Sequence, residues 1–344
     1  MLGEIENLKK GTFDDALITA LVKKKKKNVI QATEKYSSRA SDLMNAFTNE
    51  LDWQTQVAYT DQLSKLTKAD IVAFANKYFG DNYVVILKRK GEDKNIVKVD
   101  KPPITPVETN RDAQSAFVKQ INNMPATPVK PVWLDYKKDL QKSTIGPAEV
   151  LYVQNKDNSL FRLRYRFDIG TWNNKKLSLA AQYLQFLGTN KMNAEEITKA
   201  FYKIACSFNI SAGSEFTTVT IEGLQENFSP AVKLFEDVLK NCKADDAALQ
   251  SLKLRLKKSR TDAKANKGAI MSGLMNYARF GKVNPFNTTL SNTEIDDISS
   301  SELVNTLHGL NSYSHKILYY GPQPLAQLTT SLKTMHSIPA VFKA

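Results

Sequence analysis

The sequence predicts an α+β fold in which an antiparallel sheet is covered by helices. Between residues 161 and 169, apolar and polar side chains alternate with the period of two that a strand buried on one face requires. Residues 229–239 instead repeat their apolar side chains every three to four positions, as an amphipathic helix does. Because segments of both kinds follow one another, helices and strands are expected to pack as layers.

Residues 1–91 are predicted to form helices followed by one strand. Helical patterns open at Phe13 and close at Phe47, and Thr67 is placed to cap a helix over residues 68–78. Tyr83–Leu87 reads Tyr-Val-Val-Ile-Leu, a β-branched and aromatic composition typical of a buried strand.

Residues 92–147 are predicted to form a stiff interdomain connector. Seven of the twelve prolines lie between residues 101 and 147, and no glycine occurs between Gly91 and Gly146. Proline without glycine favours an extended chain. Within it, Ala113–Ile121 is expected to form a short helix and Val132–Leu134 to dock on a domain surface.

Residues 148–344 are predicted to form a second unit that begins with strands. Glu149–Gln154 is expected to pair as a hairpin with the alternating strand at 161–169. Two further strands, at 204–212 and 216–224, are expected to pair across the turn at Gly213.

Helices are predicted between and after these strands. One runs from Lys175 to Leu187, and a second begins at Asn193, which forms a capping box with Glu196. Ser229, followed by proline, is expected to cap a third helix, and Asp245 or Asp246 a fourth that ends near Ala265.

An internal repeat links the two units. Residues 66–91 and residues 298–321 both read as a Ser/Thr-capped helix followed by a strand that ends at glycine, about 230 positions apart. We interpret this as a duplication of a whole unit. Residues 1–91 are then the C-terminal part of an incomplete first copy, and residues 148–344 are the second copy.

The charge of the chain is spread along its length. Of 344 residues, 48 are Lys or Arg and 35 are Asp or Glu, a net charge of +13. Five consecutive lysines at 23–27 would surround a helix, so most of them are expected to be solvated. Nucleic-acid binding by net charge is therefore the weakest of the functional hypotheses.

Cysteine and histidine are scarce. Cys206 and Cys242 are too few for a disulfide framework and are expected to be buried thiols. His308, His315 and His336 all lie in the last forty residues, and no carboxylate accompanies His308 and His315, so no zinc site is expected there.

Residues 179–189, Leu-Ala-Ala-Gln-Tyr-Leu-Gln-Phe-Leu-Gly-Thr, resemble the active-site helix of the pitrilysin/insulinase family of zinc metallopeptidases. Active copies in that family read H-x-x-E-H followed by F-x-G-T. Aligning Phe186–Thr189 with the second motif places Leu179 and Tyr183 at the zinc histidines and Gln182 at the catalytic glutamate. The resemblance implies tandem α+β units of about 230 residues joined by a connector.

The three aligned side chains cannot perform zinc hydrolysis. Leucine has no ligand atom, tyrosine rarely ligates zinc, and glutamine cannot take a proton from a metal-bound water. The family's third ligand is a glutamate on a later helix, but no glutamate occurs between Glu236 and Glu294. No catalytic or metal-binding residue is therefore assigned, and zinc is expected only in a catalytic copy of the parent protein.

The resemblance implies a non-catalytic scaffold and substrate-chamber portion of a longer zinc endopeptidase. The expected partners are the other domains of that parent, unfolded peptide, and a second copy of the chain through the incomplete first unit. Arg162, Arg164 and Arg166 share one strand face and are candidate peptide contacts, although ordinary surface packing also explains them. The alternative is a binding or assembly subunit of the same fold with no peptidase role.

No membrane span is expected, because no apolar run approaches the ~20 residues that a spanning helix needs. The first residues lack the basic start and apolar centre of a signal peptide. The compartment is left open: a signal peptide on the parent chain would direct it to the periplasm or cell envelope, and otherwise it would be cytoplasmic.

Overall fold

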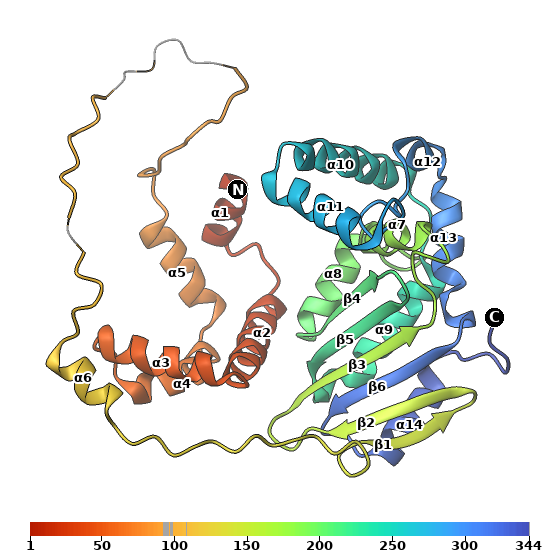
Figure 1. The fold of residues 1–344 in the computed structure, drawn as a ribbon, viewed down its shortest axis with the longest axis horizontal. Coiled ribbons are helices and arrows are strands. Elements are labelled where there is room, and N and C mark those ends of the chain that lie inside the picture. Colours follow the sequence, from red (N-terminus) through yellow and green to blue (C-terminus); the bar gives the residue numbers. More distant parts are fainter. Residues whose placement is uncertain (92–95, 97–98, 108, 344) are drawn as a thin grey trace.

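The computed structural model describes residues 1–91, 96, 99–107 and 109–343. A set of N-terminal helices lies beside a larger sheet-containing unit. A long connector leaves the last of these helices, passes around their outer side and leads to the first strand of the sheet (Figure 1). The N-terminal helices are α1 (Leu2–Lys10), α2 (Ala16–Thr33), α3 (Tyr36–Thr48), α4 (Trp53–Leu63) and α5 (Lys68–Tyr78). The connector carries α6 (Ala116–Asn122), which confirms the short helix expected there.

The second unit is built on one six-stranded sheet. Its strands are β1 (Gln141–Ile145), β2 (Ala148–Gln154), β3 (Leu160–Phe167), β4 (Ser207–Ala212), β5 (Thr217–Leu224) and β6 (His315–Gly321). Their order is β1-β2-β6-β3-β5-β4, and β6 pairs in parallel with β2 and antiparallel with β3. The α+β class is confirmed, but the β2–β6 pair makes the sheet mixed. The sheet also begins at Gln141, within the range assigned to the connector.

The hairpin expected between β2 and β3 is wrong. The chain does turn between them, where the Asn155 side chain accepts hydrogen bonds from the backbone N–H groups of Asp157 and Asn158. However, β6 lies between the two strands and pairs with both. The pairing is decided by a strand far along the chain, which local turn signals cannot reveal.

Helices cover one face of this sheet and one end of it (Figure 1). They are α7 (Lys176–Tyr183), α8 (Ala194–Lys203), α9 (Phe228–Asn241), α10 (Asp246–Lys264), α11 (Lys267–Phe280), α12 (Asn292–Asp297), α13 (Ser300–His308) and α14 (Leu325–Met335). Helix α9 packs its apolar side on the sheet, with Phe228 edge-on to Phe161 at 5.1 Å between ring centroids.

The predicted caps are largely confirmed. The side chains of Asn193 and Asp245 accept from backbone N–H groups at the starts of α8 and α10, and Thr67 forms a capping box with Asp70. The cap predicted at Ser229 is wrong, because α9 begins earlier, at Phe228. Its N-cap residue, Asn227, uses its side-chain amide to donate to the carbonyl of Ile204 instead.

The N-terminal helices have almost no core of their own. Among the described residues before Ile145, only Ala20, Ala46 and Ala75 are buried apolar side chains. Tyr83–Leu87, expected to be a buried strand, is extended and exposed, and forms no strand. The docking predicted for Val132–Leu134 is also wrong, since these side chains are exposed.

Helix α2 joins the N-terminal helices to the second unit through polar contacts. Asp14, just before α2, forms an ion pair with Lys203 at 2.8 Å, and Glu34, just after it, accepts from the amide of Asn158 at 3.0 Å. Within the lysine run, Lys24–Lys26 are exposed, whereas Lys23 and Lys27 are half-buried on the side that faces the second unit. None of the described helices is both long and apolar enough to cross a bilayer.

Candidate functional site

Helix α7, the segment that resembles a zinc-binding helix, is held tightly to the sheet. The chain enters it through Gly170, where an added Cβ would lie 2.3 Å from the carbonyl oxygen of Ser214. The backbone N–H groups of Thr171 and Trp172 donate to the carbonyls of Gly213 and Ser214, at 2.8 and 3.0 Å. The start of α7 is therefore fixed on the turn between β4 and β5, and only glycine fits at position 170.

The two positions aligned with zinc histidines are part of the core. Leu179 is 2% exposed and Tyr183 is fully buried. The hydroxyl of Tyr183 donates to the carbonyl of Asp245 and accepts from the N–H of the same residue, each at 2.7 Å. Burial raises the pKa of this phenol, which keeps it neutral. The side chain links α7 directly to the start of α10.

Gln182, aligned with the catalytic glutamate, is exposed. Its amide nitrogen donates to the carbonyl of Ser178 in the preceding turn, at 3.2 Å. On α10, Lys253 donates to the carbonyls of Asp296 and Ile298, and Arg260 to that of Leu290. The helix expected to supply a third ligand thus presents cations, and this donor set does not fit zinc.

No group of three or more His, Cys, Asp or Glu side chains that could hold a metal occurs within the described residues. Cys206 and Cys242 are free and buried, as expected. Burial raises the pKa of Cys206 to about 12 and that of Cys242 to about 11, so both thiols stay protonated near neutral pH.

Two cavities lie along β4 and share Gln182. The larger, about 920 Å³, extends from α7 and the Gly213 turn to α10, α11 and Phe286. The smaller, about 420 Å³, runs beside residues 207–210 and is bounded by α7, α8 and the lysines of α2. We call the two together the β4 groove. Gln182 lies where they meet.

The β4 groove follows a sheet edge. β4 is the last strand in the sheet order and pairs only with β5 among the described strands. The groove wall is mainly apolar on the α11 side, where Ile270 and Leu274 are more than half exposed. A free strand edge beside apolar pockets is a geometry that binds an extended peptide by strand addition.

The three candidate arginines share one face of β3, opposite the core. Arg162 donates to Glu222 on β5 at 3.0 Å, and the guanidinium of Arg166 stacks on the ring of Phe216 at 3.6 Å. Only Arg164 lacks an ion pair or ring contact among the described residues, and it is exposed. Two of the three candidate peptide contacts thus already have partners within the chain, and the peptide contact itself stays a prediction.

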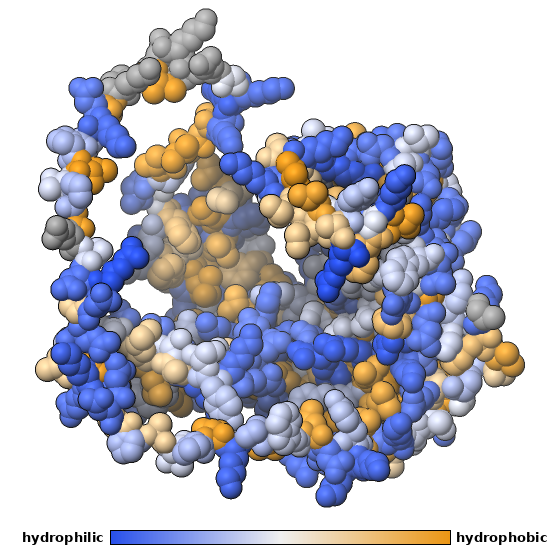
Figure 2. All heavy atoms as spheres, viewed as in Figure 1, coloured by the Kyte–Doolittle hydropathy of each residue, from blue (hydrophilic) through white to orange (hydrophobic). Residues whose placement is uncertain are grey.

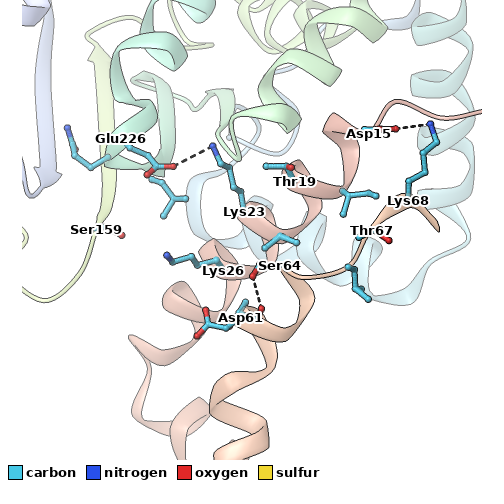
Figure 3. Close-up of a pocket in the computed structure, with 16 residues that line it drawn as sticks. Asp15, Thr19, Lys23, Lys26, Asp61, Ser64, Thr67, Lys68, Ser159 and Glu226 are labelled. Atoms are coloured by element: carbon cyan, nitrogen blue, oxygen red, sulfur yellow. Dashed lines mark hydrogen bonds and ion pairs between the residues drawn. The ribbon is translucent and has the colours of Figure 1, made fainter. Parts of the chain in front are cut away.

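A third cavity, of about 710 Å³, lies between α2, α4 and the second unit (Figure 3). Lys23 reaches across it to Glu226 at 3.7 Å, and Lys68 pairs with Asp15 at 2.7 Å. Its charged side chains are of both signs and largely paired with each other. The cavity is therefore a polar seam between the two parts of the chain.

Sequence reasoning missed a buried network of ionisable residues. Nδ1 of His315 lies 2.8 Å from the carbonyl of Tyr313, so it carries the proton, and Nε2 must accept from Nε2 of His336 at 2.9 Å. Nδ1 of His336 contacts the carboxylate of Glu236 at 2.8 Å, and its ring stacks on Tyr165. These residues come from four separate elements, and no sequence motif connects them.

A model of the insulinase family of peptidases (family M16) matches residues 171–293. This range contains α7, α8, the β4–β5 pair, α9, α10 and α11, and among these α7, α8, β4, α10 and α11 line the β4 groove. This segment belongs to the insulinase family. The resemblance inferred from residues 179–189 is therefore confirmed. No curated protein matches the chain.

Solved structures of a peptidase domain and of two proteases share the fold. The inactive domain of an M16 peptidase from Pseudomonas fluorescens is 20% identical with a TM-score of 0.51, covering 60% of this chain and 52% of that one. The periplasmic protease PqqL from Escherichia coli is 12% identical with a TM-score of 0.50, covering 99% and 40%. The ferredoxin protease FusC, solved with Arabidopsis ferredoxin, is 12% identical with a TM-score of 0.52, covering 90% and 37%.

The chain spans only about half of the first of these proteins and about two fifths of the others. At these identities the similarity shows the fold alone. The matched segment is thus part of an insulinase-type, peptidase-like domain, and Leu179, Gln182 and Tyr183 lie within it.

Proposed function

We propose that this chain is a non-catalytic scaffold and substrate-chamber portion of an insulinase-type zinc endopeptidase. One observation carries the non-catalytic part: the motif helix is intact, but Leu179 and Tyr183 are core residues, and Tyr183 bonds to Asp245 where a metal ion would otherwise link the helices. Zinc is expected in a catalytic copy elsewhere in the parent protein.

The chamber role is supported by the β4 groove. An extended peptide of about five residues spans about 17 Å, similar to the length of a six-residue strand such as β4. Added along the free edge of β4, it would pass first one cavity and then the other, so that side chains from its two ends could enter different cavities. Because glutamine cannot act as a base, peptide bound there would be held without being cut.

Groove binding can be measured with a fluorescently labelled, unstructured peptide that carries aromatic and aliphatic residues at alternate positions. Leu274→Glu places a charge in the groove and should weaken binding about tenfold or more, the effect of losing one buried leucine contact. Leu254→Glu is the matched control, because Leu254 is exposed on α10 but outside the groove. Equal loss in both variants would contradict the proposal.

Catalysis and metal content provide the second test. The chain alone should neither cleave the labelled peptide nor retain one zinc per chain after dialysis. Tight stoichiometric zinc, with cleavage that a chelator abolishes, would overturn the non-catalytic assignment. The alternative, an assembly subunit with no peptidase role, predicts no peptide binding in the β4 groove at all.

A further inference from the structure

The chain as a whole exposes far more surface than a compact protein of its mass, and both the N-terminal helices and the exposed connector contribute to this. A compact monomer of 38.6 kDa should expose about 14,000 Å², whereas this chain exposes 24453 Å². The excess of about 10,000 Å² exceeds the total area of a standard protein interface, about 1,600 Å², several times over. Apolar side chains gather on the N-terminal part, facing the hollow between the connector and the second unit (Figure 2).

The most apolar exposed stretch directly follows α5. All five side chains of Tyr83–Leu87 are more than half exposed. Just before it, Phe74, Tyr78 and Phe79 form an exposed aromatic cluster, with ring centroids 4.6 and 6.1 Å apart. We call residues 67–87, which contain both groups, the docking segment. Exposed apolar surface of this extent marks an interaction site.

The second unit contains a buried counterpart of the docking segment. Thr67 caps α5 as Ser299 caps α13. The helix starts, Lys68 and Ser300, each precede Tyr83 and His315 by 15 positions. The shared spacing aligns residues 83–87 with residues 315–319, the first five of β6.

In the counterpart, the apolar side of the strand β6 and the apolar side of the helix α13 are both covered by the core. Ile317 and Tyr319 of β6 point into the core, and Leu303 and Leu307 of α13 are buried. β6 is central, held by β2 in parallel and β3 antiparallel, and both neighbours come from the start of the unit. The corresponding Val85 and Leu87 lack such neighbours among the described residues.

We propose that the docking segment supplies the central strand to the sheet of a partner: the first half of another insulinase-type unit, with strands like β2 and β3 separated by an empty position. Tyr83–Leu87 would pair in parallel with the first strand and antiparallel with the second. This rests on the chain being part of a larger insulinase-type assembly, but not on peptide binding in the β4 groove.

The chain itself provides a position in which to test this fit. In the full chain, residues 299–319 are replaced by the sequence of residues 67–87, which has the same length. The exchanged chain should unfold cooperatively, with slow hydrogen exchange in the transplanted strand. The first exchange also replaces the buried side chains of α13, and a poor fit of the new helix could by itself prevent folding. A second variant therefore replaces only residues 316–319, within β6, with the sequence of residues 84–87.

Two substitutions in the transplanted strand give the decisive comparison. In the exchanged chain the copy of Val85 stands at the inward position of Ile317. Val85→Asp in this copy buries a carboxylate and should abolish the cooperative unfolding transition. The copy of Val84 stands at the position of Lys316, whose Nζ lies 2.9 Å from a carboxylate oxygen of Glu149. Val84→Lys in this copy restores the lysine and should be tolerated. Failure of both exchanges to fold, or equal effects of the two substitutions, would overturn the proposal.

The unaltered chain supplies a further readout. Light scattering should show a monomer, because the partner is a different half-unit. If it instead shows a dimer that Val85→Asp converts to a monomer, the docking segment binds a second copy and the proposal is wrong. Neither experiment alters a residue of the β4 groove, so a failure here is distinguishable from a failure of the proposed peptide binding.

Discussion

The Tyr183 hydroxyl and the Asp245 backbone form a closed pair of hydrogen bonds, one in each direction and each 2.7 Å long. The pair joins α7 to the residue that caps α10. These two bonds hold together segments that lie 62 positions apart in the sequence.

Tyr183→Phe removes this link while keeping the ring. The N–H of Asp245, which is an exposed residue, then loses its protein acceptor, so the free energy of unfolding should fall by about 1 kcal/mol. Urea denaturation of the variant and of the unaltered chain measures the change. Tyr36→Phe, at an exposed tyrosine, is the control and should have no effect. Identical stabilities would show that the two bonds contribute nothing.

Restoring the motif should not restore the metal site. The triple variant Leu179→His, Gln182→Glu, Tyr183→His supplies two imidazoles and a carboxylate, but α10 has no glutamate and presents Lys253 and Arg260. A polar ring in place of buried Leu179 should lower stability by about 3 kcal/mol. Calorimetric titration with zinc should show no tight one-to-one binding. Tight binding accompanied by a higher melting temperature would contradict this expectation.

Gly170→Ala should loosen the entrance to α7. Its Cβ would clash with the Ser214 carbonyl oxygen at 2.3 Å, and moving the backbone of the β4–β5 turn should cost about 1–3 kcal/mol. Gly3→Ala is the control, because nothing lies within 4 Å of its Cβ position. Thermal unfolding distinguishes the two. Comparable melting temperatures for both variants would mean that the turn adapts freely.

Acid should destabilise the second unit through His315. Burial lowers the pKa of His315 to about 4, below the usual value of 6.5, so the folded state resists taking up a proton that the unfolded chain accepts. The free energy of unfolding should therefore fall as the pH drops from 6.5 to 4, by about 3 kcal/mol in total. Urea denaturation at several pH values measures this slope.

The charged and titratable neighbours of His315 are His336 on the segment after α14, Glu236 on α9 and Asp168 after β3. His315→Asn should flatten the pH dependence, whereas His308→Asn, at an exposed histidine, should leave it in place. An unchanged slope in the His315 variant would assign the acid sensitivity to the other members of the network.

Local sequence patterns predicted the elements, and long-range pairing decided where the predictions failed. The β4–β5 pair and the caps at Asn193 and Asp245 depend on residues a few positions apart, and each is confirmed. The β2–β3 hairpin failed because β6 inserts between the two strands. The strand at Tyr83–Leu87 failed because strand composition cannot form a ladder without neighbours.

The sequence predicted which helix would form the candidate site, but not which residues and cavities would surround it. The helix predicted around Leu179, Gln182 and Tyr183 is present in the structure, while the assignment of these residues to zinc-motif positions stays a prediction. The sequence could not show that Tyr183 would bind the backbone of Asp245, 62 positions away, or that two cavities would meet at Gln182. The Glu236–His336 contact spans 100 positions, beyond the reach of any local pattern.

The place of β6 in the sheet also governs how the unit must assemble. Lys316 contacts Glu149 across 167 positions, so β2 and β3 cannot be joined until nearly the whole unit has been synthesised. Until then their facing edges are unpaired. Such a long loop closure slows folding and exposes the intermediate to wrong strand pairing. During translation β2 and β3 therefore cannot gain their shared neighbour until Gly321, the last residue of β6, has left the ribosome.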